Sequence, residues 1–270
     1  MLPAGYPAAR DDIVRVAAGV RGYLTRREME CLCLLAAVPT APGAILEIGS
    51  FMGRSTVLLA KAAALAGGSE VHAVDPLDAP SSTDPDLRGA DSSAEAFHAN
   101  LARTGVADAV CHHRMRSEAL AEHWQGDLRL LWIDGDHTLH GARTDWVSFR
   151  PHLSDGAIVA MHDVLHTFEG GVRVFAEDLL LSEHIGAAGL CGSIAWAQFH
   201  HDPADAASHR EANLRLYRKM ARLIPFVAFG RKPRGLARLR WKIARWRVPH
   251  GPLDPASFLA AVDRKGLPSR

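Results

Sequence analysis

Cysteine is scarce in this chain: there are four in 270 residues, with no C-x-x-C pair and no zinc-ligand spacing. A disulfide-held secreted scaffold is therefore excluded. Cys31 and Cys33 lie in an apolar stretch of helical character, where thiols usually act as small core residues. Long apolar runs are also missing, because no segment has the roughly 20 apolar residues that cross a bilayer. The N-terminus has no signal-type run either, so we expect a cytoplasmic protein.

A strong excess of either charge is absent as well, since the formal net charge is +1. That total conceals a division along the chain. Residues 1–200 hold 15 Lys and Arg against 25 Asp and Glu, a net charge of −10, whereas residues 201–270 hold 16 against 5, a net charge of +11. Because 48% of the residues are apolar and 23% are charged, the chain can bury a sizeable core, which excludes disordered and collagen-like proteins.

Short apolar strands alternate with helical segments from residue 44 onward. Strands are expected at 44–49, 71–75, 109–111, 128–133, 157–161 and 192–199. Helices are expected at 25–38, 54–66, 94–104, 117–124, 143–152 and 171–182, with a turn at 154–156. This alternation predicts an α/β fold, a doubly wound and mostly parallel sheet with helices on both faces.

The division of charge along the chain and the pattern of strands together predict three regions. We expect an N-terminal helical cap over residues 1–43, a central α/β domain over 44–200 and a basic helical extension over 201–270. In open α/β sheets, ligands bind beyond the carboxyl ends of the strands. Polar residues follow several of the predicted strands at that end, namely 47–53, Asp75, 134–137 and 162–163. This edge of the sheet is therefore the expected site.

The turn after the first strand reads EIGSFMGRST, with Gly49 and Gly53 four residues apart. It lacks the G-x-G-x-x-G of dinucleotide loops and the G-K-[ST] of P-loops. An acid at position 47, before the turn, would repel a pyrophosphate, but it suits a ligand with an ammonium group and ribose hydroxyls. Asp75, at the end of the second strand, is placed to accept hydrogen bonds from a ribose.

Four blocks in order, ILEIGSFMGRST, VHAVDP, LLWIDGDHTLHGA and DGAIVAMHDV, resemble a class I S-adenosylmethionine-dependent methyltransferase. More narrowly, they are similar to the Rossmann-like O-methyltransferases that act on sugars and small natural products. The resemblance covers roughly residues 20–200 and implies S-adenosyl-L-methionine as cofactor. It implies that Glu47, Gly49, Ser50 and Gly53 surround the methionine part and that Asp75 holds the ribose. Ser117 falls where family members contact the adenine side.

Carboxylates from two strand ends can share one hard divalent cation. The resemblance assigns Asp134 and Asp163 to the positions at which metal-dependent members bind magnesium. Val164 stands where those members have a further ligand, and His162 precedes the acid. The third ligand is left open between His162 and Asp136.

The methyl donor is already activated as a sulfonium, so the protein mainly has to deprotonate and aim an oxygen. By the resemblance, the general base follows the first metal acid by two or three residues, which gives Asp136 or His137. We favour His137 because an imidazole titrates near neutrality. The expected function is methyl transfer to a hydroxyl of a saccharide, an oligosaccharide or a glycosylated small molecule.

Two other classes of function stay open on the sequence. His137, His162 and an acid could form the two-His, one-carboxylate iron site of a metal-dependent hydroxylase, or serve a hydrolase. The segment 231–248 holds eight Lys and Arg and two Trp, which suits a peripheral contact with an anionic membrane. A non-catalytic role through this segment is the third class. A homo-oligomer is left open, and nucleic acid is the less favoured partner.

Overall fold

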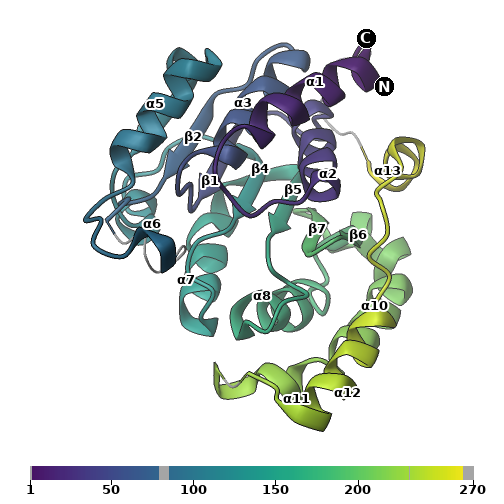
Figure 1. The fold of residues 1–270 in the computed structure, drawn as a ribbon. Helices are drawn as coiled ribbons and strands as arrows, with labels where there is room; N and C mark the ends of the chain where they lie inside the picture. The colour runs from purple at the N-terminus through teal and green to yellow at the C-terminus, as the bar shows by residue number, and fades with distance from the viewer. Residues whose placement is uncertain (1, 79–84, 231, 264–270) are drawn as a thin grey trace.

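A seven-stranded sheet runs through the molecule in the order β3-β2-β1-β4-β5-β7-β6 (Figure 1). The computed structural model describes residues 2–78, 85–230 and 232–263. The strands are β1 (Ala44–Ile48), β2 (Val71–Val74), β3 (Val110–His113), β4 (Leu128–Ile133), β5 (Leu153–Met161), β6 (Ile185–Cys191) and β7 (Ile194–Phe199). The first five strands pair with one another in parallel, and β7 is antiparallel to both β5 and β6. The predicted α/β fold is confirmed.

The chain reverses its direction of winding between β1 and β4. From β1 the sheet grows outward through β2 to β3, and the chain then returns to place β4 on the other side of β1. The crevice at such a switch point is the usual ligand site of a doubly wound sheet. The segments that leave β1 and β4 therefore begin side by side at the place where a ligand is expected.

Helices cover both faces of the sheet, and each face has its own apolar core. On one face α1 (Tyr6–Ala18), α2 (Arg26–Ala37), α3 (Arg54–Leu65) and α5 (Ala94–Thr104) pack over Ile45, Leu130 and Ile158. On the other face α6 (Ser117–Ala121), α7 (Leu139–Phe149), α8 (Glu169–Arg173) and the π-helical turn Val174–Leu179 pack over Leu46, Leu131 and Val159. Neighbouring strand residues thus face opposite cores, as the alternation of a strand requires. Burial on both faces explains why the sequence of these strands is apolar throughout.

Helix α2 shows how the sequence sets an element's start. Thr25 is its N-cap, and its hydroxyl accepts from the Glu28 amide while the Glu28 carboxylate accepts from the Thr25 amide at 2.8 Å. This capping box satisfies amides that the first turn leaves without an intrahelical partner. Cys31 and Cys33 on the same helix are buried, as expected for core thiols.

Three local expectations were wrong. The predicted turn at 154–156 lies inside β5, where Gly156 has φ 87° beside a register shift in the β4–β5 pairing. Helix α7 begins at Leu139 rather than 143, because Thr138 caps it by accepting from the Gly141 amide. Strand β6 was missed: the Gly and Ala residues at its centre carry little apolar signal, and only the pairing with β7 makes it a strand.

The C-terminal part contributes to both cores. Its helices are α9 (Pro203–Ala206), α10 (Arg210–Met220), α11 (Ile224–Val227), α12 (Gly235–Trp246) and α13 (Pro255–Ala261). Met220 and Trp241 are buried in the core that holds α7 and α8, whereas Phe258 is buried with α1 and α2 on the opposite face. The boundaries expected at 43 and 200 stay predictions. Within the described residues no helix has the length and apolarity that a membrane crossing needs.

Candidate active site

The loop after β1 lies directly against the end of β4. Gly49 has φ 86°, and a Cβ at this position would fall on the Asp134 carbonyl oxygen. Only glycine allows this approach, because an L side chain would meet backbone and would also be strained at that φ. Gly53, with φ 90°, then ends the loop as the N-cap of α3. The two glycines therefore bring the first turn and the Asp134 segment together.

Glu47 is fully buried in β1. Its Oε2 accepts a hydrogen bond from the Thr56 hydroxyl of α3, whereas Oε1 and the nearby Ser50 hydroxyl have no hydrogen bond of normal geometry. Burial raises the pKa of Glu47 to about 7, although the neighbouring hydroxyls of Ser55, Thr56 and Ser50 act in the opposite direction. A buried carboxylate oxygen without a partner is costly, which makes this pair of groups a place where a ligand's donor would be bound.

Asp75 ties the glycine loop to the end of β2. Its Oδ2 accepts from the amides of Ser50 at 2.8 Å and Phe51 at 2.9 Å, and its Oδ1 accepts from the Leu77 amide at 2.8 Å. Phe51 has φ 49°, so the loop is held in a conformation that a bulky residue rarely adopts. Oδ2 accepts two bonds but Oδ1 only one, so Oδ1 keeps acceptor capacity and Asp75 can hold the loop and still accept from a hydroxyl.

Ser117, expected on the adenine side, begins α6 and faces α7. Its hydroxyl donates to Asp145 Oδ1 at 2.5 Å. Asp145 is buried, and burial raises its pKa to about 7 against the lowering effect of the Ser117 hydroxyl. Asp145 lies behind the β4 loop, since a Cβ on Gly135 would stand 3.4 Å from its Oδ2. Asp145 could not be recognised from the sequence, because it is a single polar residue in a helical segment with no motif around it.

Asp134 and His162 meet at the carboxyl ends of β4 and β5. His162 Nδ1 lies 3.0 Å from Asp134 Oδ1, and the imidazole is 6% exposed. On its other side, His162 Nε2 lies 3.8 Å from Glu28 Oε2, too far for a hydrogen bond. Burial by itself lowers the pKa of His162, but Asp134, Glu28 and Asp163 outweigh it and hold that pKa well above its usual value.

The sequence did not show that Glu28 also belongs to this edge of the sheet. It was recognised only as half of a capping box, yet its Oε1 also accepts from the Ser193 amide at 2.7 Å and the Ser193 hydroxyl at 2.6 Å. Burial alone would raise the pKa of Glu28, but His162 and Ser193 keep it well below its usual range. A buried imidazole between Glu28 and Asp134 is thus a cation held between two acids.

Asp163 and His137 form the second pair at this edge. Asp163 has φ 57°, in the left-handed region that few non-glycine residues adopt, and its Oδ2 lies 3.5 Å from His137 Nε2. The His137 ring stacks on Phe168, with centroids 4.6 Å apart and planes at 22°. The Gly170 amide also bonds the His137 carbonyl at 3.0 Å. His137 is therefore fixed by a ring, a backbone bond and a nearby carboxylate, while 36% of its side chain is exposed.

Asp136 is engaged locally. Its carboxylate accepts from the Thr138 amide at 2.8 Å and from the Thr138 hydroxyl at 3.0 Å, which supports the start of α7. His166 Nδ1 lies 3.6 Å from Asp163 Oδ1 and is exposed. The structure thus brings Asp134, His162, Asp163 and His137 together and leaves Asp136 on the rim.

Residues 46–164 match the family model described as a methyltransferase domain. The chain therefore contains a methyltransferase domain, with the fold of the class I S-adenosylmethionine-dependent enzymes. The match begins in β1, includes the glycine loop and Asp75, and ends just beyond Asp163, so it spans the whole edge described above. Both the methyltransferase fold and S-adenosylmethionine as methyl donor agree with the expectation from the four sequence blocks.

Solved methyltransferases share this fold at low identity. The O-methyltransferase from Bacillus cereus in complex with SAH is 18% identical, with a TM-score of 0.51 over 71% of this chain and 90% of that one. TomG from Streptomyces achromogenes, involved in tomaymycin synthesis and solved with SAM, is 19% identical, with a TM-score of 0.51 over 71% and 89%. The O-methyltransferase NovP is 13% identical, with a TM-score of 0.58 over 72% and 99%. The seven-stranded sheet is thus the shared feature.

The residues of this methyltransferase fit its methyl donor. S-adenosylmethionine carries an ammonium group and ribose hydroxyls, and the first turn offers acceptors for both kinds of group: the unpaired oxygen of Glu47, the Ser50 hydroxyl and the Asp75 carboxylate. The close approach at Gly49 leaves no room for a side chain at that position. The individual cofactor contacts stay predictions.

The residues at the predicted magnesium site fit their ion less well than the first turn fits the methyl donor. Asp134 Oδ1 and Asp163 Oδ1 lie 3.0 and 3.6 Å from the same nitrogen of His162, so an imidazole stands between the two carboxylates. Mg²⁺ prefers oxygen ligands in octahedral geometry. The compact groups of potential ligands within the described residues lie elsewhere: His72, Cys111 and His113, and Asp155, His200 and Asp205. The two strand-end acids in this arrangement do not fit magnesium.

The same placement bears on the iron alternative. A two-His, one-carboxylate site needs His137 and His162 to face one ion. His162 instead directs Nδ1 to Asp134 and Nε2 toward Glu28, while His137 directs Nε2 to Asp163. The structure therefore offers no observation that favours a hydroxylase.

Proposed function

We propose that this methyltransferase moves the methyl group of S-adenosylmethionine to a hydroxyl oxygen of a saccharide or a glycosylated small molecule. The observation that carries the proposal is the His137–Asp163 pair, 3.5 Å apart at the strand edge that also holds the cofactor turn. An imidazole backed by a carboxylate is a general base of the kind that O-methylation needs.

The proposed reaction is one displacement. The acceptor hydroxyl gives its proton to His137 Nδ1, the ring nitrogen that does not face Asp163, while its oxygen takes the methyl group that bound S-adenosylmethionine would supply, with the thioether as leaving group. The products are a methyl ether, the neutral thioether S-adenosylhomocysteine and a proton held on His137. Asp163 stabilises the imidazolium as it forms, since the two groups already lie within ion-pair distance.

The fixed position of the His137 ring also contributes to the proposed rate of methyl transfer. Phe168 stacks on one face of the His137 ring and leaves its nitrogen edge toward Asp163. The Asp163 backbone is in a sparsely populated conformation, which is the kind of strain that clusters at active sites. A base fixed in this way avoids the reorientation that a free surface histidine would need in each turnover.

The polar rim supports a hydroxyl-rich acceptor. Asp136, His140 and His166 are exposed beside the proposed base, and each offers hydrogen bonds to hydroxyl groups. Asp136 keeps acceptor capacity beyond its two bonds to Thr138. A flat aromatic acceptor would instead need apolar walls, of which Phe168 is the one aromatic ring in contact with the base among the described residues.

The test has two parts that separate cofactor from chemistry. Calorimetry with S-adenosylhomocysteine should show binding to the wild-type protein and to His137→Ala. Methyl transfer from labelled S-adenosylmethionine to a panel of mono- and oligosaccharides and glycosides should then occur only with a base present at position 137. Failure to bind S-adenosylhomocysteine would contradict the cofactor, whereas binding with transfer only to thiols or amines would contradict the acceptor.

Chelation tests the magnesium prediction directly. With EDTA-treated protein, the arrangement of His162 between the acids leads us to expect methyl transfer to continue. Loss of turnover that magnesium restores, together with magnesium binding that Asp134→Asn removes, would instead confirm the sequence-based ligand set.

A further inference from the structure

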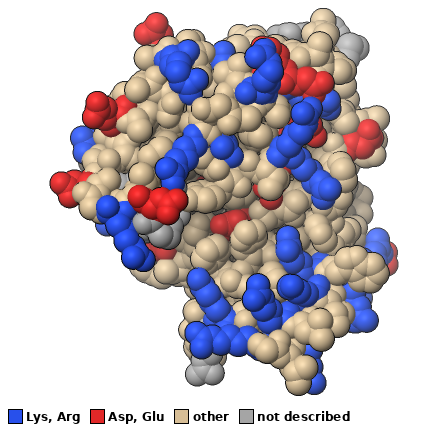
Figure 2. All heavy atoms as spheres, viewed as in Figure 1, with Lys and Arg blue, Asp and Glu red and all other residues tan. Residues whose placement is uncertain are grey.

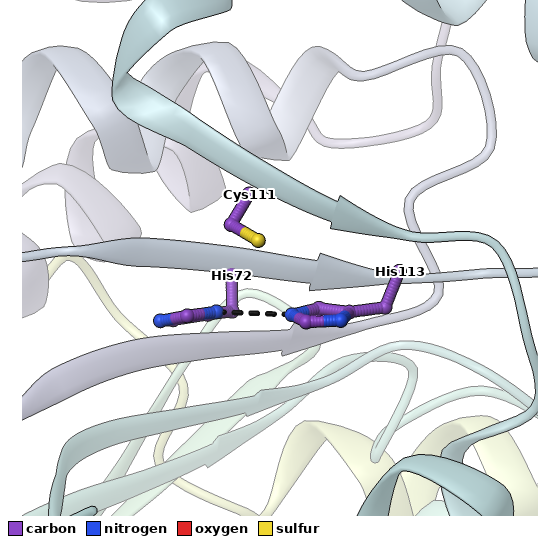
Figure 3. A group of neighbouring side chains, drawn as sticks. All are labelled: His72, Cys111 and His113. Atoms are coloured by element: carbon purple, nitrogen blue, oxygen red, sulfur yellow. Dashed lines mark hydrogen bonds between the residues drawn. The ribbon is translucent and has the colours of Figure 1, made fainter.

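Strands β2 and β3 bring His72, Cys111 and His113 together as a histidine–cysteine–histidine group (Figure 3). In their parallel pairing His72 lies opposite Cys111, and His113 is two residues further along β3. Because strand side chains alternate between faces, Cys111 and His113 point to the same side. Nothing in the proposed methyl transfer uses these three residues.

Their ligand atoms lie at metal-binding spacing. One atom from each residue can be chosen so that all three lie within 4.8 Å of one another, and His72 Nδ1 is 3.0 Å from His113 Nε2. The remaining nitrogen of His72, Nε2, lies 3.5 Å from Glu70 Oε2. A carboxylate at that position fixes the ring so that the proton is on Nε2 and Nδ1 is free to bind. Trp124 packs edge-on against the His72 ring, with centroids 4.8 Å apart.

We propose that His72, Cys111 and His113 bind a zinc ion. Two imidazole nitrogens and a thiolate form three sides of the tetrahedron that zinc prefers, and the sulfur selects against magnesium and calcium. Cys111 is the exposed one of the four cysteines, so the fourth position faces solvent and is filled by water. Binding would join the edge strand β3 to β2.

Cobalt is the sharpest probe, because Co²⁺ replaces zinc and reports a bound thiolate as a sulfur-to-cobalt charge-transfer band. The wild-type protein should show this band with Co²⁺ and lose it when Zn²⁺ is added. Cys111→Ser should abolish the band, and His113→Ala should weaken zinc binding at least tenfold in calorimetry. His123→Ala, an exposed histidine outside the group, is the matched control and should bind as wild type.

Two results would overturn the zinc site. One is a wild-type protein without a charge-transfer band, which would leave His72 and His113 as a hydrogen-bonded pair only. The other is zinc binding that is equally strong in Cys111→Ser and His113→Ala, which would assign the ion to other histidines on the surface. Both readouts are independent of methyl transfer.

A second and independent observation concerns α12. Large apolar side chains that are exposed are few among the described residues, and most of them lie in 229–246. They are Phe229 at 86% exposed, Leu236 at 75%, Leu239 at 54%, Ile243 at 45% and Trp246 at 79%. A contiguous exposed apolar patch on a globular protein usually marks an interaction surface.

Four of these residues form one stripe along α12. At 3.6 residues per turn, Leu236, Leu239, Ile243 and Trp246 fall within about 80° of the helix circumference. Trp241 is on the other side, 8% exposed, and it packs in the core with α10 and α11. The helix is therefore anchored by one face and presents a second apolar face outward.

Cations flank the stripe on both sides. Arg238 and Lys242 lie along one flank of α12, and Arg240 and Arg247 lie along the other. All four are exposed, and no carboxylate of the described residues forms an ion pair with them. Figure 2 shows Lys and Arg gathered over the lower part of the molecule, where Figure 1 places α11 and α12.

We infer that α12 lies in the headgroup region of an anionic lipid surface, with its apolar stripe toward the acyl chains. Basic flanks around an apolar face with an exposed Trp are the pattern of interfacial helices, whose long cationic side chains reach back to phosphate groups. A second copy of this chain would bring two rows of cations together, which is unfavourable. Nucleic acid would satisfy the cations but not the apolar stripe.

Phe229 adds an aromatic side chain near the start of this segment. It is held at φ 63°, and the following amide, that of Gly230, donates to Glu169 Oε2 at 3.0 Å. The turn is thus fixed by α8 while the ring stays in solvent. An exposed aromatic in a strained turn is expensive unless it has an apolar partner.

Vesicle sedimentation with the full chain tests the surface. Binding is expected to phosphatidylglycerol-containing vesicles, to be weak on phosphatidylcholine, and to fall with salt. The double variant L239Q/I243Q should lose about tenfold or more in affinity, since it removes two side chains from the acyl region. Val147→Gln, which removes an exposed apolar side chain on α7, is the matched control and should bind unchanged.

Three results would contradict this inference. Equal binding of L239Q/I243Q and wild type would show that charge alone acts. Dimerisation in lipid-free solution that L239Q/I243Q removes would assign the stripe to a second copy. RNA binding as strong as vesicle binding, and equally strong in L239Q/I243Q, would assign the cations to nucleic acid.

Discussion

The acids at the carboxyl edge of the sheet and the cations of helix α12 differ in their surroundings. The acids at the strand ends are enclosed, and each has partners: Asp75 accepts three backbone amides, and Asp134 faces a buried imidazole. The cations of α12 are exposed beside an apolar stripe. Fixed, desolvated charge suits chemistry on a small molecule, whereas exposed charge with free rotamers suits a large, adaptable surface. The near-neutral net charge of the whole chain therefore describes neither region.

The largest effect is expected from the base at the acidic edge. His137→Ala should reduce turnover by about 10²–10⁴-fold while S-adenosylhomocysteine binding is kept. His123→Ala, an exposed histidine that precedes β4 and lies outside this edge of the sheet, should change turnover little. A larger loss in Asp136→Asn than in His137→Ala would move the base to Asp136.

The two tryptophans of α12 sharpen the comparison from the other side. Trp241→Ala should lower the free energy of unfolding by about 3 kcal/mol, because it empties a core position; its unpaired indole N–H keeps the cost from being higher. Trp246→Ala should change it by no more than about 0.5 kcal/mol. Urea unfolding measures both. Equal losses would show that the outward stripe is structural.

Glu47 gives the acidic edge a pH dependence. Its pKa is raised from 4.5 to about 7 in the folded chain, so folding favours the protonated form. The stability due to this group is fully present below pH 4.5 and is lost as the pH rises through 7, by about 3 kcal/mol in total. In urea unfolding at pH 5 and pH 8, Glu47→Gln should lack this loss, whereas Glu95→Gln, an exposed acid on α5, should keep it. The same slope in both variants would contradict the assignment.

The smallest effect is expected from the glycine loop after β1. Asp75→Ala removes three acceptor bonds from the cofactor turn, so S-adenosylhomocysteine should bind about 10- to 100-fold more weakly. Asp78→Ala, an exposed acid three residues later, should bind as wild type. Calorimetry gives both affinities. Unchanged binding in Asp75→Ala would show that the turn keeps its shape without the carboxylate.

Much of the fold followed from local pattern. Apolar strands, the Thr25–Glu28 capping box and the glycine turn are short-range features, and β1, β2 and β4 lie within a residue of the predicted bounds. Where the pattern was weak, the prediction failed. β6 is a strand because β7 pairs with it, and Gly156 sits inside β5 because a register shift accommodates it.

The sequence alone determined the order of the elements, the edge of the sheet that carries polar residues and the type of ligand that the first turn could accept, since each depends on residues close together in the chain. Only the tertiary structure decided how those polar residues pair. Glu28 lies 134 positions before His162, and Phe168 reaches His137 from beyond β5. It also separated Trp241 from Trp246, because one face of α12 met a core and the other met none. Charge pairing and burial depend on contacts between distant segments, and such contacts form only when the chain is folded.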